Sequence, residues 1–267
     1  MFNRIRTGLR DLLPKRYQVP IKYWYGVLSR TLEPEMKLLG LILKNDDRVI
    51  DIGGNRGVYA YQFWRRGIRV EVFEPNPICY SVLEAWATDK PDVTVYSAAL
   101  SDRVGTANLH IPVDGSGVEH DASASIEHIG FAKARDQLVS LQILDSYQFD
   151  GVGLIKIDVE GHEYCVIAGA KKTLTSSRPA LLVEIEQRHI DKPIQEVFES
   201  ILVLGYQGFF LGVQGLTPLA EFDAPRHQSM ENFGTGKIPY VNNFLFLHRS
   251  RVVNEEYRAL LKRGFST

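Results

Sequence analysis

Short apolar runs alternate with longer amphipathic runs along much of this chain. The apolar runs are rich in Val, Ile and Leu and are bounded by turn-forming residues, which is typical of buried strands. They cover residues 48–52, 69–73, 93–96, 152–157 and 180–185. The runs between them predict helices over residues 58–64, 77–88, 162–174 and 193–204. This alternation predicts an α/β fold with a doubly wound, mostly parallel sheet, which binds ligands at the carboxyl ends of its strands.

The stretch between the third and fourth of these strands interrupts the alternation. Residues 106–111 and 138–143 alternate apolar and polar positions, which predicts two half-buried strands. Residues 114–125 between them are rich in Gly, Ser, Asp and Ala and predict a mobile loop. Long loops inside compact domains usually serve a function or are disordered. We therefore interpret residues 104–145 as a lid or a substrate-side insertion.

Two further strands are predicted near the carboxyl end of the chain, at residues 206–213 and 243–248. Residues 214–240 separate them in an excursion that contains Gly, Pro and several aromatic residues. This excursion is a candidate wall for the substrate side of a binding site. A helix over residues 254–262 is expected to close the chain.

The first 44 residues are expected to form a helical extension or lid, followed by one domain over residues 45–267. Residues 21–29 are rich in aromatic side chains, and residues 33–43 carry apolar side chains at helical intervals, so both segments are predicted as helices that cover the sheet edge or roof the ligand site. Residues 2–13 place apolar side chains opposite arginines at helical spacing. Such a helix packs over the domain, or against a second subunit in a homodimer, or lies on a membrane surface.

The composition is that of an ordinary globular protein of 267 residues with a formal net charge of -1. This balance leaves no overall basic field, so we expect no nucleic-acid partner. Cys79 and Cys165 stand far apart without Cys or His partners nearby, which argues against a disulfide framework or a zinc site and favours a reducing, cytoplasmic location. No run approaches the ~18 apolar residues of a membrane span and no secretory signal is evident, so we expect neither export nor a transmembrane segment.

A glycine-rich turn follows the first strand, and the rest of the chain is organised around it. Asp51 ends the strand, and Gly53, Gly54, Asn55 and Gly57 shape the turn, where glycines let a ligand approach the backbone. A dinucleotide-binding turn needs G-x-G-x-x-G, but the second glycine position after Gly53 holds Asn55. The acid before the glycines instead suits a cofactor with an amino-acid ammonium group, which favours S-adenosylmethionine over NAD(P).

Two further pairs of residues are expected to complete the cofactor site. Glu74 and Pro75 follow the second strand, roughly 20 residues after the glycine turn, where a doubly wound fold places the acid that binds a ribose diol. Ser101 and Asp102 follow the third strand, at the depth where an adenine would lie. Asp102 is able to accept a hydrogen bond from an exocyclic amine, although both residues are equally suited to capping a turn.

The fourth strand ends in a second polar cluster, made of Asp158, Glu160, His162 and Glu163. It lies across the switch point from the glycine turn, where a reacting group should meet the cofactor, and we expect Asp158 to contact the cofactor as well. Methyl transfer to a hydroxyl group requires removal of its proton, for which His162 and Glu160 are candidate bases. The alternative is that these residues only cap the following helix, which is most plausible for Glu163.

A further acid, Glu184, ends the fifth strand beside Asp158. Carboxylates at adjacent strand ends are able to hold Mg²⁺ and so orient a diol, or to bind sugar hydroxyl groups directly. The candidate catalytic residues are therefore Asp158, Glu160, His162 and Glu184. The sequence leaves a metal requirement open.

Five motifs, in their order and spacing, resemble the FkbM family of S-adenosylmethionine-dependent methyltransferases. They lie at residues 49–57, 73–77, 99–102, 144–145 and 155–163, and the resemblance extends from about residue 46 to 186. It implies a class I methyltransferase (Rossmann-like) fold, a seven-stranded sheet with an antiparallel last strand, and O-methylation of hydroxyl groups on sugars, glycans or small natural products. The alternatives are an NAD(P)-dependent oxidoreductase and a non-catalytic module that keeps the cofactor pocket.

The resemblance also implies roles for individual positions. Asp51, Gly53 and Gly57 would line the methionine moiety, Glu74 would bind the ribose, and Ser101 with Asp102 would flank the adenine. Gly54 stands where the family usually has alanine, a difference that we expect to matter little. All of these roles require the glycine turn and the acidic cluster to open onto the same rim of the sheet.

Overall fold

The computed structural model describes residues 13–127, 133–231 and 239–262. Residues 2–12 of the predicted N-terminal helix lie outside this range, so the homodimer and membrane-surface interpretations of that helix stay predictions. None of the described helices is long and apolar enough to cross a bilayer.

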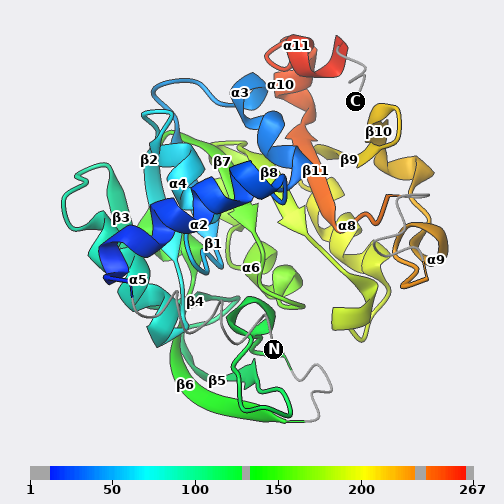
Figure 1. Cartoon of the computed structure of the whole chain (residues 1–267). Coiled ribbons are helices and arrows are strands. Elements are labelled where there is room, and N and C mark those ends of the chain that lie inside the picture. The colour runs from blue at the N-terminus through cyan, green and yellow to red at the C-terminus, as the bar shows by residue number, and fades with distance from the viewer. Residues whose placement is uncertain (1–12, 128–132, 232–238, 263–267) are drawn as a thin grey trace.

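The described residues form a central sheet of eight strands (Figure 1). In spatial order these strands are β10 (Gly215–Pro218), β9 (Tyr206–Gly212), β11 (Asn243–His248), β8 (Ala180–Glu184), β7 (Val152–Ile157), β1 (Arg48–Ile52), β2 (Arg69–Phe73) and β3 (Val93–Tyr96). β11 runs antiparallel to both of its neighbours, whereas the pairs from β8 to β3 are parallel. The mostly parallel sheet is confirmed. The predicted count of seven strands is wrong by one, because Gly215–Pro218 folds back on β9 as an antiparallel hairpin.

Side chains of the central strands are buried on both faces of this sheet, which explains their continuous apolar runs. In β1, Val49 packs with one apolar core, while Ile50 and Ile52 pack with the other. The first core lies under α2 (Lys15–Ser29), α3 (Leu39–Ile42), α4 (Val58–Trp64), α5 (Pro77–Ala87) and α11 (Arg258–Lys262). The second lies under α6 (Glu163–Ala168), α7 (Lys171–Ser176) and α8 (Ile194–Leu202). Figure 1 shows α2 crossing the front of the sheet.

Several predicted helices have different bounds in the structure. The predicted helix over 162–174 is two helices, α6 and α7, which meet at Gly169 and Ala170. Gly169 packs so closely that an added Cβ would lie 2.0 Å from the carbonyl oxygen of Ser101. The predicted helix over 33–43 is divided into a 3-10 turn, η1 (Pro34–Lys37), and the short α3. At the end of the chain, α10 (Arg249–Val253) and α11 replace the single predicted helix over 254–262.

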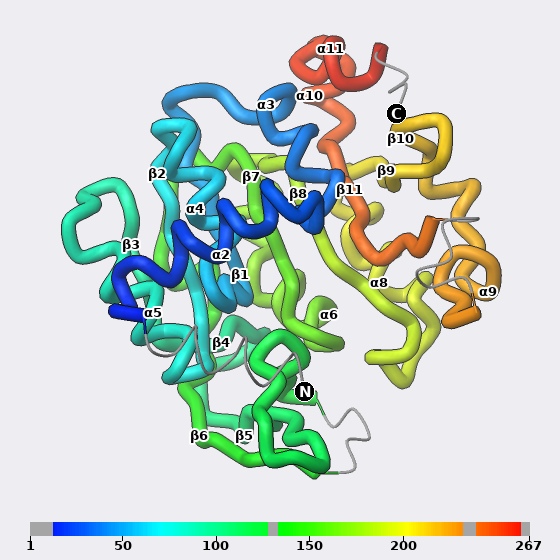
Figure 2. The backbone as a smooth tube through the Cα atoms, viewed as in Figure 1, coloured from blue at the N-terminus to red at the C-terminus, as the bar shows by residue number. Residues whose placement is uncertain are grey.

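The predicted insertion forms a second, smaller sheet below the large one (Figures 1 and 2). It consists of β4 (Ala99–Leu100), β6 (Ala134–Gln142) and β5 (Gly105–Pro112), and its own apolar core is built on Leu109, Ile111 and Leu141. The two predicted half-buried strands are thus confirmed. Between them, Asp121–Ser123 forms a single 3-10 turn, η2, in the segment predicted as a loop.

Two more elements fall in the excursion between β9 and β11. Leu219–Glu221 is a 3-10 turn, η5, and Ala224–His227 is the short helix α9. The remaining 3-10 turns are η3 (Leu144–Tyr147), beside α7, and η4 (Gln187–His189), after β8. The described part of this excursion lies at the opposite end of the large sheet from β3 (Figure 1).

Candidate active site

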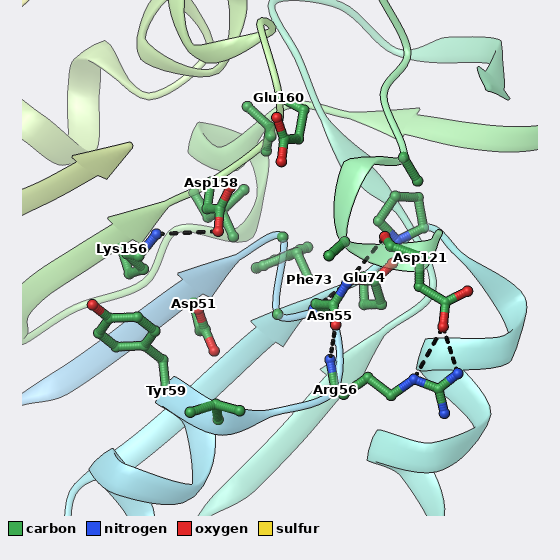
Figure 3. A pocket seen from close by; sticks show the side chains of 18 of the residues that line it. Asp51, Asn55, Arg56, Tyr59, Phe73, Glu74, Asp121, Lys156, Asp158 and Glu160 are labelled. Atoms are coloured by element: carbon green, nitrogen blue, oxygen red, sulfur yellow. Dashed lines mark hydrogen bonds and ion pairs between the residues drawn. The ribbon is translucent and has the colours of Figure 1, made fainter. Parts of the chain in front are cut away.

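A cavity of about 400 Å³ lies at the carboxyl ends of β1, β2 and β7. Its walls come from the glycine turn, the acidic turn after β7, α2 and the insertion. Figure 3 shows Asn55 of the glycine turn, Glu160 of the acidic turn and Asp121 of the insertion around this space. The predicted site residues that line it are Asp51, Gly53, Gly54, Asn55, Glu74, Pro75, Asp158, Glu160 and His162. The glycine turn and the acidic turn therefore open onto one space, as the sequence required. Gly57, Ser101, Asp102 and Glu184 do not line the cavity.

The glycine turn is fastened to the end of β2. The backbone N–H groups of Gly53 and Gly54 both donate to the Phe73 carbonyl oxygen, at 2.9 and 3.1 Å. Gly53 has a positive φ of 79°, which favours glycine. An added Cβ at Gly54 would lie 2.3 Å from Val72 Cγ1, so an alanine there would force Val72 to shift. The expectation that a glycine in place of the family's usual alanine matters little stays a prediction.

Glu74 lines the cavity and connects the glycine turn to the end of β2. Its two carboxylate oxygens accept hydrogen bonds from the backbone N–H groups of Asn55 at 2.6 Å and Asn76 at 2.7 Å. Burial raises the pKa of Glu74 to about 7, although both of these hydrogen bonds oppose that shift. Each carboxylate oxygen has a further lone pair, so Glu74 is able to hold the turn and still accept hydrogen bonds from a ligand.

Asp51 presents an unsatisfied oxygen to the cavity. Its side chain is buried, and its Oδ2 atom has no hydrogen-bond partner among the described residues. Burial raises the pKa of Asp51 to about 7, and the nearby Lys156 charge offsets part of that effect. A buried polar atom without a partner is costly, so a ligand ammonium that pairs with it would be favoured. This orphaned oxygen fits the methionine end of S-adenosylmethionine.

Lys156 is a site residue that sequence analysis missed. Its ammonium lies 3.4 Å from Asp158 Oδ2 and 3.9 Å from Glu184 Oε2, and 5.1 Å from the centre of the Tyr59 ring (Figure 3). Lys156 stands beside Asp51 in the register of β7 and β1. The indication in the sequence was a single lysine inside an otherwise apolar strand, which needs a buried partner.

Glu184 sits behind this ion pair. Its Oε1 accepts a hydrogen bond from Asn242 Nδ2 at 2.6 Å. Burial and the neighbouring Asp158 carboxylate raise the pKa of Glu184 well above its usual range, and Lys156 opposes this effect. Because Glu184 does not line the cavity, it is poorly placed to accept a proton from a ligand there.

Glu160 occupies the acidic turn in a strained conformation, with a positive φ of 52°. Its carboxylate lies 2.7 Å from His189 Nδ1, and its carbonyl oxygen accepts a hydrogen bond from Ser125 of the insertion at 2.5 Å. A non-glycine residue held at positive φ costs energy, and such strain concentrates at functional sites. The acidic turn therefore contacts both the insertion and the loop after β8.

His162 is held by two partners. Its Nδ1 lies 2.6 Å from Glu127 Oε1 and its Nε2 lies 2.9 Å from Ser101 Oγ. Burial alone would lower the pKa of His162, but hydrogen bonds to Cys165 and Glu127 raise it to about 9. The imidazole is therefore protonated at neutral pH, and with both nitrogens occupied it lacks a free site for a proton.

Ser101 and Asp102 lie one layer behind the cavity wall. Ser101 is fully buried, and its hydroxyl is within 3.1 Å of Asp102 Oδ1 as well as in contact with His162. The Asp102 carboxylate also accepts from Arg103 at 3.1 Å on the protein surface. Their predicted place beside an adenine stays a prediction.

The insertion is bound to the glycine turn by residues that sequence analysis also missed. Arg56 is buried and donates through Nε to Asp121 Oδ2 at 3.1 Å and through a terminal nitrogen to Gln18 of α2 at 3.1 Å. Asn55 donates to the Asp121 carbonyl oxygen at 3.0 Å (Figure 3). These contacts hold η2 and α2 against the turn, so both become walls of the cavity.

The described residues contain no group of three or more His, Cys, Asp or Glu side chains arranged to hold a metal ion. At the place where Asp158 and Glu184 could have shared a cation, the Lys156 ammonium lies between them. The carboxylates on these adjacent strand ends therefore do not fit a divalent ion.

This fold and this cavity define a methyltransferase of the class I type. A family model described as "Methyltransferase FkbM domain" matches residues 51–209, which span the glycine turn, the insertion and the acidic turn. The chain belongs to the FkbM family of methyltransferases, which use S-adenosylmethionine as the methyl donor. The resemblance found in the sequence motifs is confirmed, and the oxidoreductase alternative is set aside.

Two characterised relatives share this chain's sequence over most of their length. The 2-O-methyltransferase NoeI of Sinorhizobium fredii is 30% identical over 192 residues, which cover 65% of this chain and 77% of the relative. The 31-O-demethyl-FK506 methyltransferase FkbM of Streptomyces tacrolimicus is 25% identical over 214 residues, which cover 69% and 78%. A crystal structure of methyltransferase FkbM from Methylobacillus flagellatus KT superposes with a TM-score of 0.49 at 17% identity, covering 91% of this chain and 57% of that longer one.

Proposed function

We propose that this protein transfers the methyl group of S-adenosylmethionine to a hydroxyl oxygen of a glycan or a small natural product. The observation that carries the proposal is the single cavity shared by the glycine turn and the acidic turn. The names of both relatives describe transfer to oxygen, one at a 2-O position and one on a demethylated form of FK506.

The donor would occupy the glycine-turn side of the cavity. The orphaned Asp51 oxygen would pair with the methionine ammonium, and the free lone pairs of Glu74 would accept from the ribose hydroxyl groups. Burial of both acids keeps water from competing for these contacts. Bound S-adenosylmethionine supplies a sulfonium methyl group, and the chain has to orient it and exclude water.

The acceptor would approach from the side of the acidic turn. Asp158 is the best-placed proton acceptor because its side chain lines the cavity, is partly exposed, and has only the Lys156 ion pair as a side-chain contact of its carboxylate among the described residues. Glu160 is the second candidate, although His189 already contacts its carboxylate. His162 is better suited to support the turn, since Glu127 and Ser101 already engage both of its ring nitrogens, and Glu184 does not line the cavity.

The N-terminal segment would serve as a roof over the acceptor. Lys22 and Tyr25 of α2 and Glu33 before η1 all line the cavity, so the described part of the N-terminal segment, residues 13–44, contributes to the site. We infer that this segment, together with the insertion, selects the acceptor.

A transfer assay tests the proposed function. The protein is incubated with S-adenosylmethionine and separate acceptors, among them 31-O-demethyl-FK506 and unmethylated bacterial oligosaccharides, and S-adenosylhomocysteine release is measured with and without a chelator. We expect release that depends on one class of acceptor and is insensitive to the chelator. Methylation of an amine or a carboxylate in place of a hydroxyl would contradict the proposal.

A further inference from the structure

The Lys156 ammonium is buried beside the cavity without the hydrogen bonds it needs. Its side chain is 1% exposed, and no acceptor among the described residues completes a hydrogen bond to Nζ. The nearest carboxylate oxygens, on Asp158 and Glu184, lie at 3.4 and 3.9 Å. An ammonium has three N–H donors, and burial without acceptors is costly. A ligand atom that accepts from Nζ would relieve this cost.

The surroundings of Lys156 decide which kind of ligand atom this is. Asp51, Glu33, Asp158 and Glu184 all contribute negative potential at Nζ. Burial favours the neutral amine, but these acids hold the pKa of Lys156 above its usual range, so the ammonium stays charged. A further carboxylate, such as that of the methionine moiety, would be repelled by the acids. A hydroxyl oxygen carries no net charge and accepts hydrogen bonds, so it suits this position.

We propose that Lys156 and Asp158 together bind the hydroxyl group that is methylated, with Lys156 donating to its oxygen and Asp158 receiving its proton. This inference rests on the proposed O-methyltransferase function. The strand places both side chains on the same side of the sheet, because they are two residues apart at the end of β7. In this proposal the positive charge of Lys156 orients the hydroxyl oxygen, as a bound divalent ion would.

The proposed step balances with these two groups. One lone pair of the hydroxyl oxygen forms the bond to the methyl carbon, and a second lone pair accepts from Lys156. The carbon–sulfur bond breaks and its electron pair stays on sulfur, which leaves neutral S-adenosylhomocysteine. The hydroxyl proton moves to the Asp158 carboxylate, so the acceptor leaves as a neutral methyl ether.

The proposal can be tested without knowing the acceptor. Sinefungin carries an amino group on carbon at the place of the sulfonium methyl group, whereas S-adenosylhomocysteine carries nothing there. The sinefungin ammonium would therefore lie next to Asp158 and Lys156. Calorimetry at neutral pH measures the dissociation constant of each ligand. We define the preference for sinefungin as the dissociation constant of S-adenosylhomocysteine divided by that of sinefungin. A substitution that affects only the contacts of the shared adenosine and amino-acid parts leaves this ratio unchanged.

We expect Asp158→Asn to reduce the preference for sinefungin about tenfold, because an attractive charge is lost. Lys156→Met should raise that preference about tenfold, because a repelling charge next to the sinefungin ammonium is lost. Lys171→Met, at an exposed position on α7, is the control and should change neither affinity.

Two outcomes would overturn the proposal. An unchanged preference in both variants would place the two side chains away from the transferred methyl group. An equal loss of both ligands in Lys156→Met would assign the ammonium to the methionine carboxylate. If thermal unfolding shows that Lys156→Met does not fold, Lys156→Gln replaces it with the same expected direction. Failure of wild-type protein to bind either ligand would instead contradict the proposed function itself.

Discussion

The carbonyl oxygen of Asp158 lies against the Cα atom of Gly53, so that a Cβ added at Gly53 would come within 1.8 Å of it. The acidic turn that begins at Asp158 is also joined to β1, because the Asp158 N–H donates to the Ile52 carbonyl oxygen at 3.0 Å. The strand end that carries the acid is therefore packed directly on the turn that would receive the donor. This contact fixes the distance between the two halves of the site.

We expect Gly53→Ala to destabilise the protein by about 3 kcal/mol, because it adds a backbone clash to an unfavourable positive φ. It should also abolish binding of S-adenosylhomocysteine at temperatures where the variant is still folded. Gly67→Ala is a matched control, since Gly67 has a similar φ of 73° but nothing within 4 Å of an added Cβ. It should cost only about 1–2 kcal/mol and leave binding intact. Equal effects of the two substitutions in thermal unfolding and calorimetry would argue against the close packing.

A second prediction concerns the bond between the insertion and the glycine turn. The Arg56 and Asp121 side chains are both largely buried, so removing either deprives the other of a buried ion pair. We expect Arg56→Ala and Asp121→Ala each to weaken S-adenosylhomocysteine binding about tenfold. A double-mutant cycle should give a coupling energy of about 1–3 kcal/mol. Arg103→Ala, at an exposed position just before the insertion, should leave affinity unchanged, and additive effects at positions 56 and 121 would refute the coupling.

The raised pKa values of Asp51 and Glu74 predict how ligand binding depends on pH. Both groups have a pKa of about 7 in the free protein, above the usual value of about 4 for such acids, so the folded state binds protons more tightly than the unfolded state. Their contribution to stability is therefore present below about pH 4 and is lost as the pH rises through 7.

In the proposed function the ligand ammonium would pair only with ionised Asp51, so S-adenosylhomocysteine affinity should rise about tenfold from pH 6 to pH 8. Calorimetry across this range measures the effect, together with release of protons on binding near pH 6.5. Asp51→Asn should bind more weakly and show a flatter profile, shaped by Glu74 alone. A wild-type affinity that falls with rising pH would contradict the assignment of Asp51 to the methionine ammonium.

Proton removal provides a fourth prediction. We expect Asp158→Asn to lower turnover about 10²-fold or more with the acceptor found in the transfer assay, because general base catalysis contributes that much, while S-adenosylhomocysteine binding is largely kept. Glu160→Gln should lower turnover less, since His189 occupies its carboxylate. Exposed Asp150→Asn serves as a control in the same assay. Unchanged turnover in both Asp158→Asn and Glu160→Gln would remove the end of β7 from the reaction.

The sequence predicted the parts of the site that depend on local patterns. Local sequence patterns of a few residues were enough to predict the buried strands, the glycine at position 53 and the acids at positions 74 and 158. The glycine and both acids line the cavity. Contacts between distant segments leave no such mark. The partners of Arg56 and His162 come from the insertion, 65 and 35 residues away in the chain.

Other differences arise where tertiary packing overrides a local preference. Residues 162–174 have a helical pattern, but the close approach of Gly169 to the Ser101 backbone divides them into two helices. The β10 hairpin adds an eighth strand because a short Gly-containing segment happens to meet the free edge of β9. Lys156 was missed although it stands alone in an apolar strand, because one of its carboxylate neighbours, Glu184, lies on the neighbouring strand β8.

The most direct test of the account is calorimetric titration of S-adenosylhomocysteine and NAD into the wild-type protein and Glu74→Ala, with exposed Glu84→Ala as the control. We predict that the wild type and Glu84→Ala bind S-adenosylhomocysteine at one site per chain and do not bind NAD, and that Glu74→Ala loses most of this affinity while remaining folded. Tight binding of NAD without binding of S-adenosylhomocysteine, or full affinity in Glu74→Ala, would contradict the claim that the glycine turn and the acidic turn enclose a methyl donor.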